Sequence, residues 1–430
     1  KRRGAPFAPR SAWTVPSGRN DRYVTTSEPK AISMDHVIFI TSQFPETHET
    51  FILREFRGLM RAEIPFEIVS LKRCRDKVVH PEVEPLRERT VTLGKGLATI
   101  GAGLGWWLKH PWKAVKAAAT LARWTIKGKP GPLVNLGIFL MVGRMASLYA
   151  ARADGIRLHA HWATVPASVA VLLSRTLGVP WGMTAHAWDI YKGDRLLEEK
   201  IGEADFVVTC TGYNRRHLNR LPGGAVPGKV FLNYHGLELD SLPRKTDYGL
   251  STPMRVLGVG RLVEQKGIEI LVEAMARTQT PIAVTLVGSG PLEESLRRRA
   301  QRLGVGDRLE IISTSPHADV LERMRTSDLF AAPSVIASDG DRDGIPNVVL
   351  EAMGVGLPVV ASTVSGIPEV VVDGRSGLSV EPGSAQSLAE AIDRMASDEY
   401  LRRELADEAR NRVHAMFDIE RNVEELVQIF

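Results

Sequence analysis

The sequence predicts an α/β fold with two Rossmann-like domains, each built on a parallel sheet. From residue 35 onward, short runs rich in β-branched residues alternate with longer helical segments, as in parallel strands joined by crossover helices. With 430 residues, the chain is long enough to form two separate cores. The stretch 236–253 is polar, contains proline and lacks a hydrophobic period, so it is the best linker between two halves of similar size.

The individual elements follow from this alternation. The strands expected in the first half are 35–42, 66–72, 155–162, 180–186, 206–211 and 229–233. The helices expected between them are 49–63, 111–126, 132–152, 165–177 and 212–220. In the second half, the strand segments are MRVLGVG, IAVTLVG, RLEIIS, DLFAAP and PVVAS. The predicted division is a leader at 1–33, a first domain at 34–235, a linker at 236–253, a second domain at 254–405, and a C-terminal helix at 406–430 that crosses back to the first domain.

Composition and charge narrow the class of protein. The chain is 44% hydrophobic and 24% charged, which is ordinary for a soluble globular protein. Its net charge of +5 favours anionic partners such as phosphates or lipid head groups and does not indicate nucleic acid. Two cysteines supply neither a disulfide framework nor a cysteine-rich metal site, and they favour a reducing cytosol. The longest apolar run, LGIFLMVG, ends at Arg144, short of a spanning helix, and residues 1–33 read as a disordered leader without a signal-peptide core.

Two glycine-rich turns follow predicted strands of the second half. In GVGRLVEQKG, residues 258–267, the glycines permit a tight turn, and Arg261 and Lys266 place positive charge where a phosphate could be held. Glu264 stands where a nicotinamide-dinucleotide motif needs its third glycine, so that fold is disfavoured. Alone, the motif is equally consistent with a turn carrying two solvated cations. Together with VGSGPLEESLRRRA, it gives one sheet edge two strand-to-helix junctions, as expected where a nucleotide crosses that edge.

The acidic segment DGDRDGIPNVVLE, residues 339–351, has two interpretations. Its aspartates and glycine match the first ligand positions of a calcium loop, but the twelfth position holds Leu350, so calcium is disfavoured. Residues 344–346 instead lead into a helix whose first amides can bind an anion. Asp343 and Glu351 can accept hydrogen bonds from ribose and sugar hydroxyls, and the other two aspartates are interpreted as solvated.

Four ordered segments carry a family resemblance. GVGRLVEQKG, VGSGPL, SPHADVLERMRTSDLFAAPS and DGIPNVVLEAMGVGLPVVAS together resemble the donor-binding domain of family 4 retaining glycosyltransferases of exopolysaccharide or colanic-acid type. These enzymes have the GT-B fold, in which two Rossmann-like parallel-sheet domains face each other across a cleft. The similarity continues into SGIPEVVVDGRSGLSVEPG and spans nearly all of the second domain. It implies a nucleotide-sugar donor in the second domain and an acceptor in the first.

The resemblance also implies roles for individual residues. Arg261 and Lys266 match the residues that grip the donor diphosphate, Glu351 matches the acid that holds the ribose, and Asp343 stands one methylene shorter than the family's glutamate. The implied donor-binding set is Gly260, Arg261, Lys266, Gly288, Gly290, Thr314, Gly344, Ile345, Pro346, Asn347, Val348 and Glu351.

The first domain resembles the family through FPETHETFILREF, HAHWAT and TAHAWDIY. His186 ends a predicted strand, and the family match favours an active-site role for it over a structural one, whereas His159 is interpreted as structural. The implied catalytic residues are His186, Asp343, Arg261 and Lys266. The acceptor-side candidates are Glu46, Thr47, His161 and Asp189.

The activity implied is transfer of a sugar, with retention, from a nucleotide sugar to a glycan or polyprenyl-linked acceptor in surface polysaccharide or glycolipid synthesis. In this family the departing phosphate helps to deprotonate the acceptor, so catalysis rests on holding the diphosphate and is expected to need no metal and no cofactor. Two alternatives stay open: a sugar-nucleotide epimerase or phosphorylase of the same shape, and a non-catalytic scaffold that binds nucleotide sugars.

Residues 106–129 form a basic amphipathic segment. The basic stripe is Lys113, Lys116, Arg123 and Lys127, the apolar stripe is Trp112, Val115, Ala119, Ala122 and Ile126, and Trp106, Trp107 and Trp124 are candidate interfacial aromatics. Such a helix can lie on an anionic bilayer, which would imply a lipid-linked acceptor and a cytoplasmic enzyme on the inner face of the membrane. The alternative, which we favour, is that the apolar stripe packs on the domain core.

Overall fold

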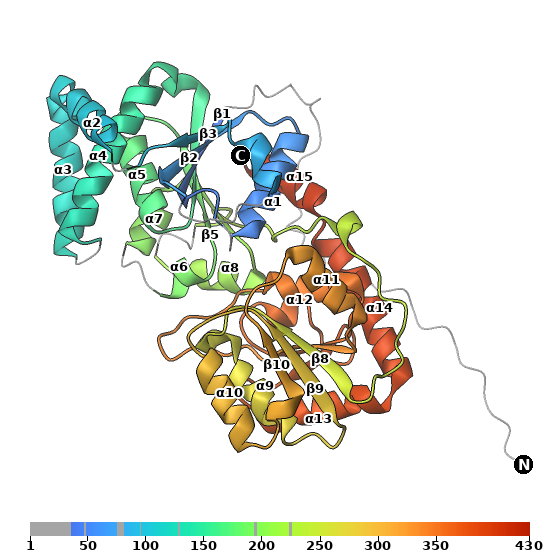
Figure 1. The fold of residues 1–430 in the computed structure, drawn as a ribbon. Helices are drawn as coiled ribbons and strands as arrows, with labels where there is room; N and C mark the ends of the chain where they lie inside the picture. The colour runs from blue at the N-terminus through green and yellow to red at the C-terminus, as the bar shows by residue number, and fades with distance from the viewer. Residues whose placement is uncertain are drawn as a thin grey trace, which may run out of the picture. The chain divides into compact units, whose positions relative to one another are not determined.

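The computed structural model describes residues 36–430 apart from 47–48, 75–80, 95, 128–129, 193–195 and 223–225. The predicted leader therefore lies outside the described residues. Within them, the chain forms two parallel sheets covered by helices, which confirms the predicted fold class (Figure 1).

The first sheet has the strand order β3-β2-β1-β4-β5-β6-β7, and all its pairs are parallel. Its strands are β1 (His36–Gln43), β2 (Phe66–Lys72), β3 (Thr90–Thr92), β4 (Ile156–His161), β5 (Trp181–Ala185), β6 (Phe206–Thr209) and β7 (Val230–Leu232). The order reverses between β1 and β4. In doubly wound sheets ligands bind beyond the carboxyl ends of the strands at such a reversal.

The second sheet repeats this arrangement in the order β10-β9-β8-β11-β12-β13. Its strands are β8 (Met254–Val259), β9 (Ile282–Val287), β10 (Leu309–Ile312), β11 (Leu329–Ala332), β12 (Val359–Ser362) and β13 (Leu378–Val380). The reversal falls between β8 and β11, which carry the first glycine-rich turn and the acidic segment at their carboxyl ends.

The helices complete both domains. Those of the first domain are α1 (Thr50–Arg61), α2 (Leu97–Lys109), α3 (Pro111–Ile126), α4 (Pro132–Tyr149), α5 (Val165–Leu177), α6 (Trp188–Tyr191), α7 (Leu197–Glu203) and α8 (Gly212–Leu218). Those that follow the linker are α9 (Ile268–Met275), α10 (Glu293–Arg302), α11 (His317–Thr326), α12 (Asn347–Val355), α13 (Ala385–Ser397), α14 (Glu399–Met416) and α15 (Ile419–Ile429).

The last helix packs on the first sheet's side of the molecule. α15 lies against α1, where Val423 approaches the backbone of Gly58 (Figure 1). The Phe430 ring lies 5.8 Å from the rings of Phe39 and Phe206 between ring centroids. The segment before it, α14, packs on α12 of the second sheet.

Helices α2, α3 and α4 stand together beside the first sheet (Figure 1). The prediction that the apolar stripe of α3 packs on the domain core is wrong, because Trp112 and Ile126 are 80% and 86% exposed. α3 instead buries a second stripe, Ala117, Leu121 and Trp124, whose spacing also places it on one helical face. Trp106, Trp107 and Trp124 are buried, so the prediction of interfacial aromatics at these three positions is also wrong.

One described segment, 132–155, is long and apolar enough to cross a membrane, which the sequence prediction had excluded at Arg144. It comprises α4 and the turn after it, and 44% of its apolar 18-residue window is buried in the fold. Val142, Met145 and Tyr149 of α4 belong to the first-domain core. These core contacts account for part of the apolar composition of α4, whose start exposes Leu133 and Leu136.

Candidate active site

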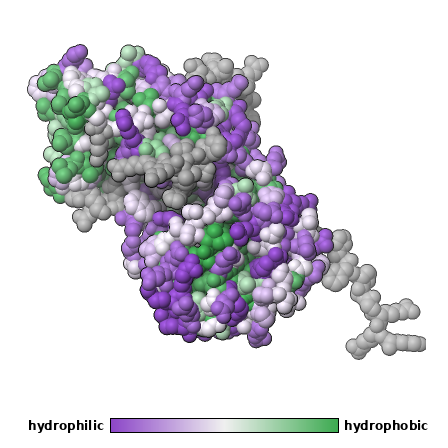
Figure 2. Space-filling view, in the orientation of Figure 1, coloured by the Kyte–Doolittle hydropathy of each residue, from purple (hydrophilic) through white to green (hydrophobic). Residues whose placement is uncertain are grey.

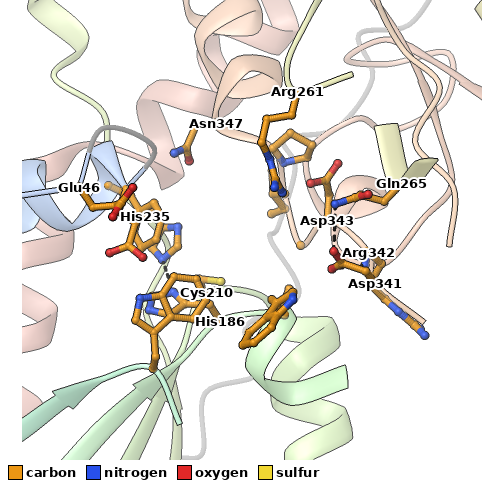
Figure 3. Close-up of a pocket in the computed structure, with 18 of the residues that line it drawn as sticks. Glu46, His186, Cys210, His235, Arg261, Gln265, Asp341, Arg342, Asp343 and Asn347 are labelled. Carbon is orange, nitrogen blue, oxygen red and sulfur yellow. Dashed lines mark hydrogen bonds between the residues drawn. The ribbon is translucent and has the colours of Figure 1, made fainter. Parts of the chain in front are cut away.

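A pocket of about 510 Å³ is lined by residues of both domains. The loops after β8 and β11 supply Arg261, Lys266 and residues 341–347, while the first domain supplies His186 at the end of β5 (Figure 3). The pocket thus lies where the reversed strand order of two parallel sheets predicts a ligand.

Glycines fix the shape of the second-domain wall. Gly267 has φ +61°, and a Cβ there would lie 1.8 Å from the carbonyl oxygen of Pro333. A Cβ on Gly288 would lie 2.0 Å from the carbonyl oxygen of Gly260. These loops meet backbone against backbone, so only glycine fits, and the close contact positions the chain between Arg261 and Lys266.

Lys266 and Asp343 form an ion pair on this wall. The Lys266 Nζ lies 2.8 and 3.0 Å from the two carboxylate oxygens of Asp343, and Ser334 donates to the same carboxylate at 3.2 Å. Both charged side chains are less than one-fifth exposed. Arg261 is exposed, and Figure 3 shows its guanidinium at the pocket. The charge of Lys266 is therefore paired with that of Asp343 within the same wall.

The N-terminus of α12 opens at the same wall. Pro346 precedes the helix, Asn347 begins it, and no described side chain caps its first turn. The first amides of a helix have no intrahelical acceptor and carry the positive end of the helix dipole. Gly344 to Asn347 thus provide a backbone surface suited to an anion.

Glu351 lies one turn further along α12, is buried, and does not line the pocket. Its Oε1 accepts from Arg54 of α1 at 2.6 Å and lies 3.3 Å from His317 Nε2. Burial alone would raise the pKa of Glu351, but the hydrogen bond to His317 and the charge of Arg54 together hold that pKa below its usual value. This carboxylate therefore joins the two domains in the unliganded protein.

On the opposite wall, the His186 ring is buried and contacts the side chains of His235 and Trp162. Its Nδ1 lies 3.2 Å from His235 Nε2, and its centroid lies 4.3 Å from that of the Trp162 ring (Figure 3). Burial, followed by the neighbouring His235, lowers the pKa of His186 well below its ordinary value. Burial also lowers the pKa of His235 to about 3. Both imidazoles are therefore neutral at physiological pH and add no charge to this wall.

The acceptor-side candidates fall in different places. Glu46 lines the pocket, whereas Thr47 lies outside the described residues. His161 is fully buried, stacks on Phe39 and does not line the pocket. Asp189 is also buried, and its carboxylate accepts from the backbone nitrogens of Ala163 and His186 at 2.7 and 2.9 Å. Burial raises the pKa of Asp189 to about 6 against the effect of those hydrogen bonds, and its position identifies it as a residue that orients the His186 turn.

The remaining donor-binding candidates lie outside the pocket lining. Gly260, Gly288 and Gly290 form the tight loop contacts behind the wall. Thr314 is exposed in the loop after β10, and Val348 is half-buried in the first turn of α12.

Several pocket residues were not predicted individually from the sequence. Glu49, Trp162, Cys210, His235 and Gln265 all line the pocket. Burial raises the pKa of Glu49 to about 7. Cys210 and Trp162 each follow directly after a buried strand, and this position at a strand end could have indicated that they lie at the pocket.

Contacts between the domains surround the pocket. Glu369 of the second domain accepts from the backbone nitrogens of Gly212 and Tyr213 at the start of α8, at 2.8 and 2.6 Å. The Arg342 guanidinium lies 4.4 Å from the centroid of the Tyr191 ring. These contacts connect the two walls of the pocket.

Two Rossmann-like domains with a pocket at both strand-order reversals define the GT-B fold. The solved structure of HepE of Anabaena in complex with UDP aligns with this chain at a TM-score of 0.68 and 17% identity, covering 91% of this chain and 98% of HepE. The family model described as Glycosyl transferases group 1 matches residues 247–412. The protein is therefore a glycosyltransferase of GT-B fold.

Similar proteins extend this result beyond the second domain. The colanic acid biosynthesis protein WcaL of Escherichia coli K12, named as a glycosyltransferase, is 26% identical over 82% of this chain and 89% of its own length. The amylovoran biosynthesis glycosyltransferase AmsK of Erwinia amylovora is 34% identical over 41% of this chain and 44% of its own length. The match of residues 247–412 to the group 1 glycosyltransferase model, together with the similarity to WcaL along most of the chain, supports glycosyl transfer over the epimerase, phosphorylase and scaffold alternatives.

Proposed function

We propose that the pocket binds a nucleotide sugar, with its diphosphate against Arg261, Lys266 and the first amides of α12, and that the sugar is transferred with retention to a glycan or polyprenyl-linked acceptor. The observation that supports this most directly is the convergence of those cations and that helix N-terminus on one pocket, opposite the neutral His186. HepE, with the same fold, was solved with UDP, and WcaL and AmsK are named for polysaccharide synthesis.

Donor binding on this proposal is an exchange of partners. The diphosphate competes with Asp343 for Lys266, whose Nζ lies 2.8 Å from one Asp343 oxygen. Once released, the Asp343 carboxylate can accept hydrogen bonds from the hydroxyls of the sugar. The same side chain would thus keep Lys266 in position before binding and orient the sugar after it.

The leaving diphosphate carries the developing charge of the reaction. Arg261, Lys266 and the helix amides are fixed donors that can stabilise this charge as the bond to the sugar breaks. An oxygen of the leaving phosphate would take the proton of the acceptor hydroxyl. Since these groups supply the positive charge, we propose that transfer needs no divalent metal and no further cofactor.

We further propose that the acceptor is presented to the enzyme at a membrane surface. Exposed apolar side chains gather on α2, α3 and the start of α4, and Figure 2 shows this hydrophobic patch. They are Leu97, Leu104, Leu108, Trp112, Val115, Ile126, Leu133, Val134 and Leu136. Basic side chains lie on the same helices, although Arg123 and Lys127 are paired with Glu199 at 2.6 and 2.9 Å. An anionic bilayer suits such a surface, which would place the enzyme in the cytoplasm, on the inner face of the membrane.

The test compares two lysines. Lys266→Ala should weaken binding of UDP, GDP or ADP, whichever stabilises the wild-type protein, by about 10-fold or more, because it removes a charge-assisted contact to phosphate. Lys116→Ala, on the exposed face of α3, should leave that affinity unchanged. Calorimetric titration measures both.

Equal effects of the two substitutions would contradict the assigned pocket. Hydrolysis or epimerisation of the donor without any acceptor would instead favour the epimerase or phosphorylase alternative. Donor binding with no transfer to glycan or lipid extracts would favour the scaffold.

A further inference from the structure

Three potential metal ligands meet on the first-domain wall of the pocket. One ring nitrogen of His186, one of His235 and the sulfur of Cys210 all lie within 4.8 Å of one another. They follow three neighbouring strands, β5, β7 and β6 respectively. Figure 3 shows the two rings side by side, with the Cys210 sulfur beside them.

The spacing of the two imidazoles suits zinc. His186 Nδ1 and His235 Nε2 lie 3.2 Å apart. Two nitrogen ligands of a tetrahedral zinc ion, each about 2.0–2.1 Å from the metal, are themselves about 3.3 Å apart. The sulfur lies within 4.8 Å of each nitrogen, and its separation from each nitrogen in such a site is about 3.5 Å, so each of these distances has to shorten by about 1.3 Å at most.

The surroundings hold the rings in this orientation. Phe51 stacks on His235 at 4.3 Å between ring centroids, and Trp162 lies at the same centroid distance from His186. His186 is only 4% exposed. Its other ring nitrogen, Nε2, is buried and has no hydrogen-bond partner among the described residues. One hydrogen bond between the rings therefore leaves the polar groups of this cluster incompletely satisfied.

The donor set selects the kind of ion. Two imidazoles and a thiolate suit zinc and other borderline transition metals, whereas magnesium and calcium require oxygen ligands. Three protein ligands leave the fourth position of a tetrahedral ion open. All three residues line the pocket, so the open position faces the space assigned to the reactants.

We propose that His186, His235 and Cys210 form a zinc-binding site whose open coordination position faces the pocket, and that zinc bound there blocks transfer. Binding replaces the thiol proton of Cys210, which is released to solvent, so each zinc ion bound releases one proton. The blocking rests on the proposed function, because zinc would occupy the place of the sugar beside His186. The metal binding does not depend on it.

Cobalt(II) titration of the metal-free protein tests the site by spectroscopy. Wild-type protein should bind one cobalt ion per chain, with the visible absorption of a tetrahedral ion and a near-ultraviolet band from thiolate to metal, and zinc should displace it. Cys210→Ser should lose the thiolate band and weaken zinc binding by about 10-fold or more. Cys74→Ser, at the only other cysteine, should behave as the wild type does.

The proposed zinc site would be wrong if the tetrahedral spectrum is absent. It would also be wrong if Cys210→Ser binds zinc as tightly as the wild type does. Should Cys210→Ser fail to fold, as judged by circular dichroism, His235→Asn carries the same comparison. Zinc should inhibit transfer by the wild type and much less by Cys210→Ser, and inhibition that is equal in both would overturn the blocking. A metal-free enzyme without transfer activity would contradict the proposed function and leave the cobalt result intact.

Discussion

Arg54→Ala tests the contact that joins the domains behind the pocket. Arg54 of α1 and Glu351 of α12 are 12% and 4% exposed, and their charged atoms lie 2.6 Å apart. Removing one partner of a buried ion pair costs about 3–5 kcal/mol, because the other charge is left buried. His317 lies 3.3 Å from Glu351 Oε1 and can still hydrogen-bond it, so the expected loss in free energy of unfolding is smaller, about 2–3 kcal/mol.

The loss should depend on pH. In the wild type the pKa of Glu351 is held below its usual value, so its stabilisation is present above about pH 4.5 and is lost as the pH falls through the lowered pKa. In Arg54→Ala, burial is opposed only by His317, so the pKa of Glu351 rises and the carboxylate takes up a proton under mildly acidic conditions. The difference in stability between variant and wild type should therefore be largest at pH 7.5 and shrink toward pH 4.5.

Urea unfolding followed by tryptophan fluorescence at the two pH values measures this effect. Arg57→Ala is the matched control, one turn along the same helix, since Arg57 makes more exposed pairs with Glu238 and Glu82 at 3.2 and 3.3 Å. Such pairs contribute up to about 1 kcal/mol. Equal losses for the two variants, or a loss for Arg54→Ala that is independent of pH, would refute the assignment of Glu351 as a buried charge held by Arg54.

Two further predictions concern the pocket and the exposed helices. Because burial raises the pKa of Glu49 to about 7, its ionised form destabilises the fold, with a penalty that is absent below about pH 4.5 and grows as the pH rises toward 7. The stability advantage of Glu49→Gln over the wild type in thermal unfolding should grow by about 2 kcal/mol between pH 5 and pH 8. An advantage that is constant with pH would contradict this cause. Trp112→Ser with Ile126→Ser should weaken sedimentation with anionic vesicles by about 10-fold, whereas Tyr400→Ser, at an exposed ring of α14, should not.

The sequence predicted the second-domain wall well because its signals are local. A glycine-rich turn after a strand, or a loop entering a helix, is contiguous in the chain, so Arg261, Lys266 and residues 344–347 could be assigned without tertiary information. The partners of these residues could not. Lys266 pairs with Asp343, 77 residues away, and Glu351 pairs with Arg54, 297 residues away. The first pair follows the neighbouring strands β8 and β11 of one sheet, and the second pair joins the two domains, so no periodicity in the chain corresponds to either separation.

Helix α2 illustrates a local signal that misleads. Residues 97–109 contain three glycines, which lower helix propensity, and no helix was predicted there. The structure needs two glycines at the contact of α2 with α4, since a Cβ on Gly103 would lie 2.5 Å from the carbonyl oxygen of Leu140, and one on Gly143 would lie 2.6 Å from that of Gly103. Close packing of the two helices outweighs the propensity.

The charges of the pocket limit how it can select an anion. Three cationic side chains and four carboxyl groups line it, so the overall charge of the lining does not attract a diphosphate. Selectivity must come from position: Lys266, Arg261 and the amides of α12 share one wall, whereas Glu46 and Glu49 lie on the other, near the neutral His186. A nucleotide sugar carries the same division, with charge on its phosphates and hydroxyls on its sugar. The arrangement therefore favours one orientation of the donor, in which the sugar lies toward the wall of Glu46 and Glu49 and the diphosphate lies toward Arg261, Lys266 and the amides of α12.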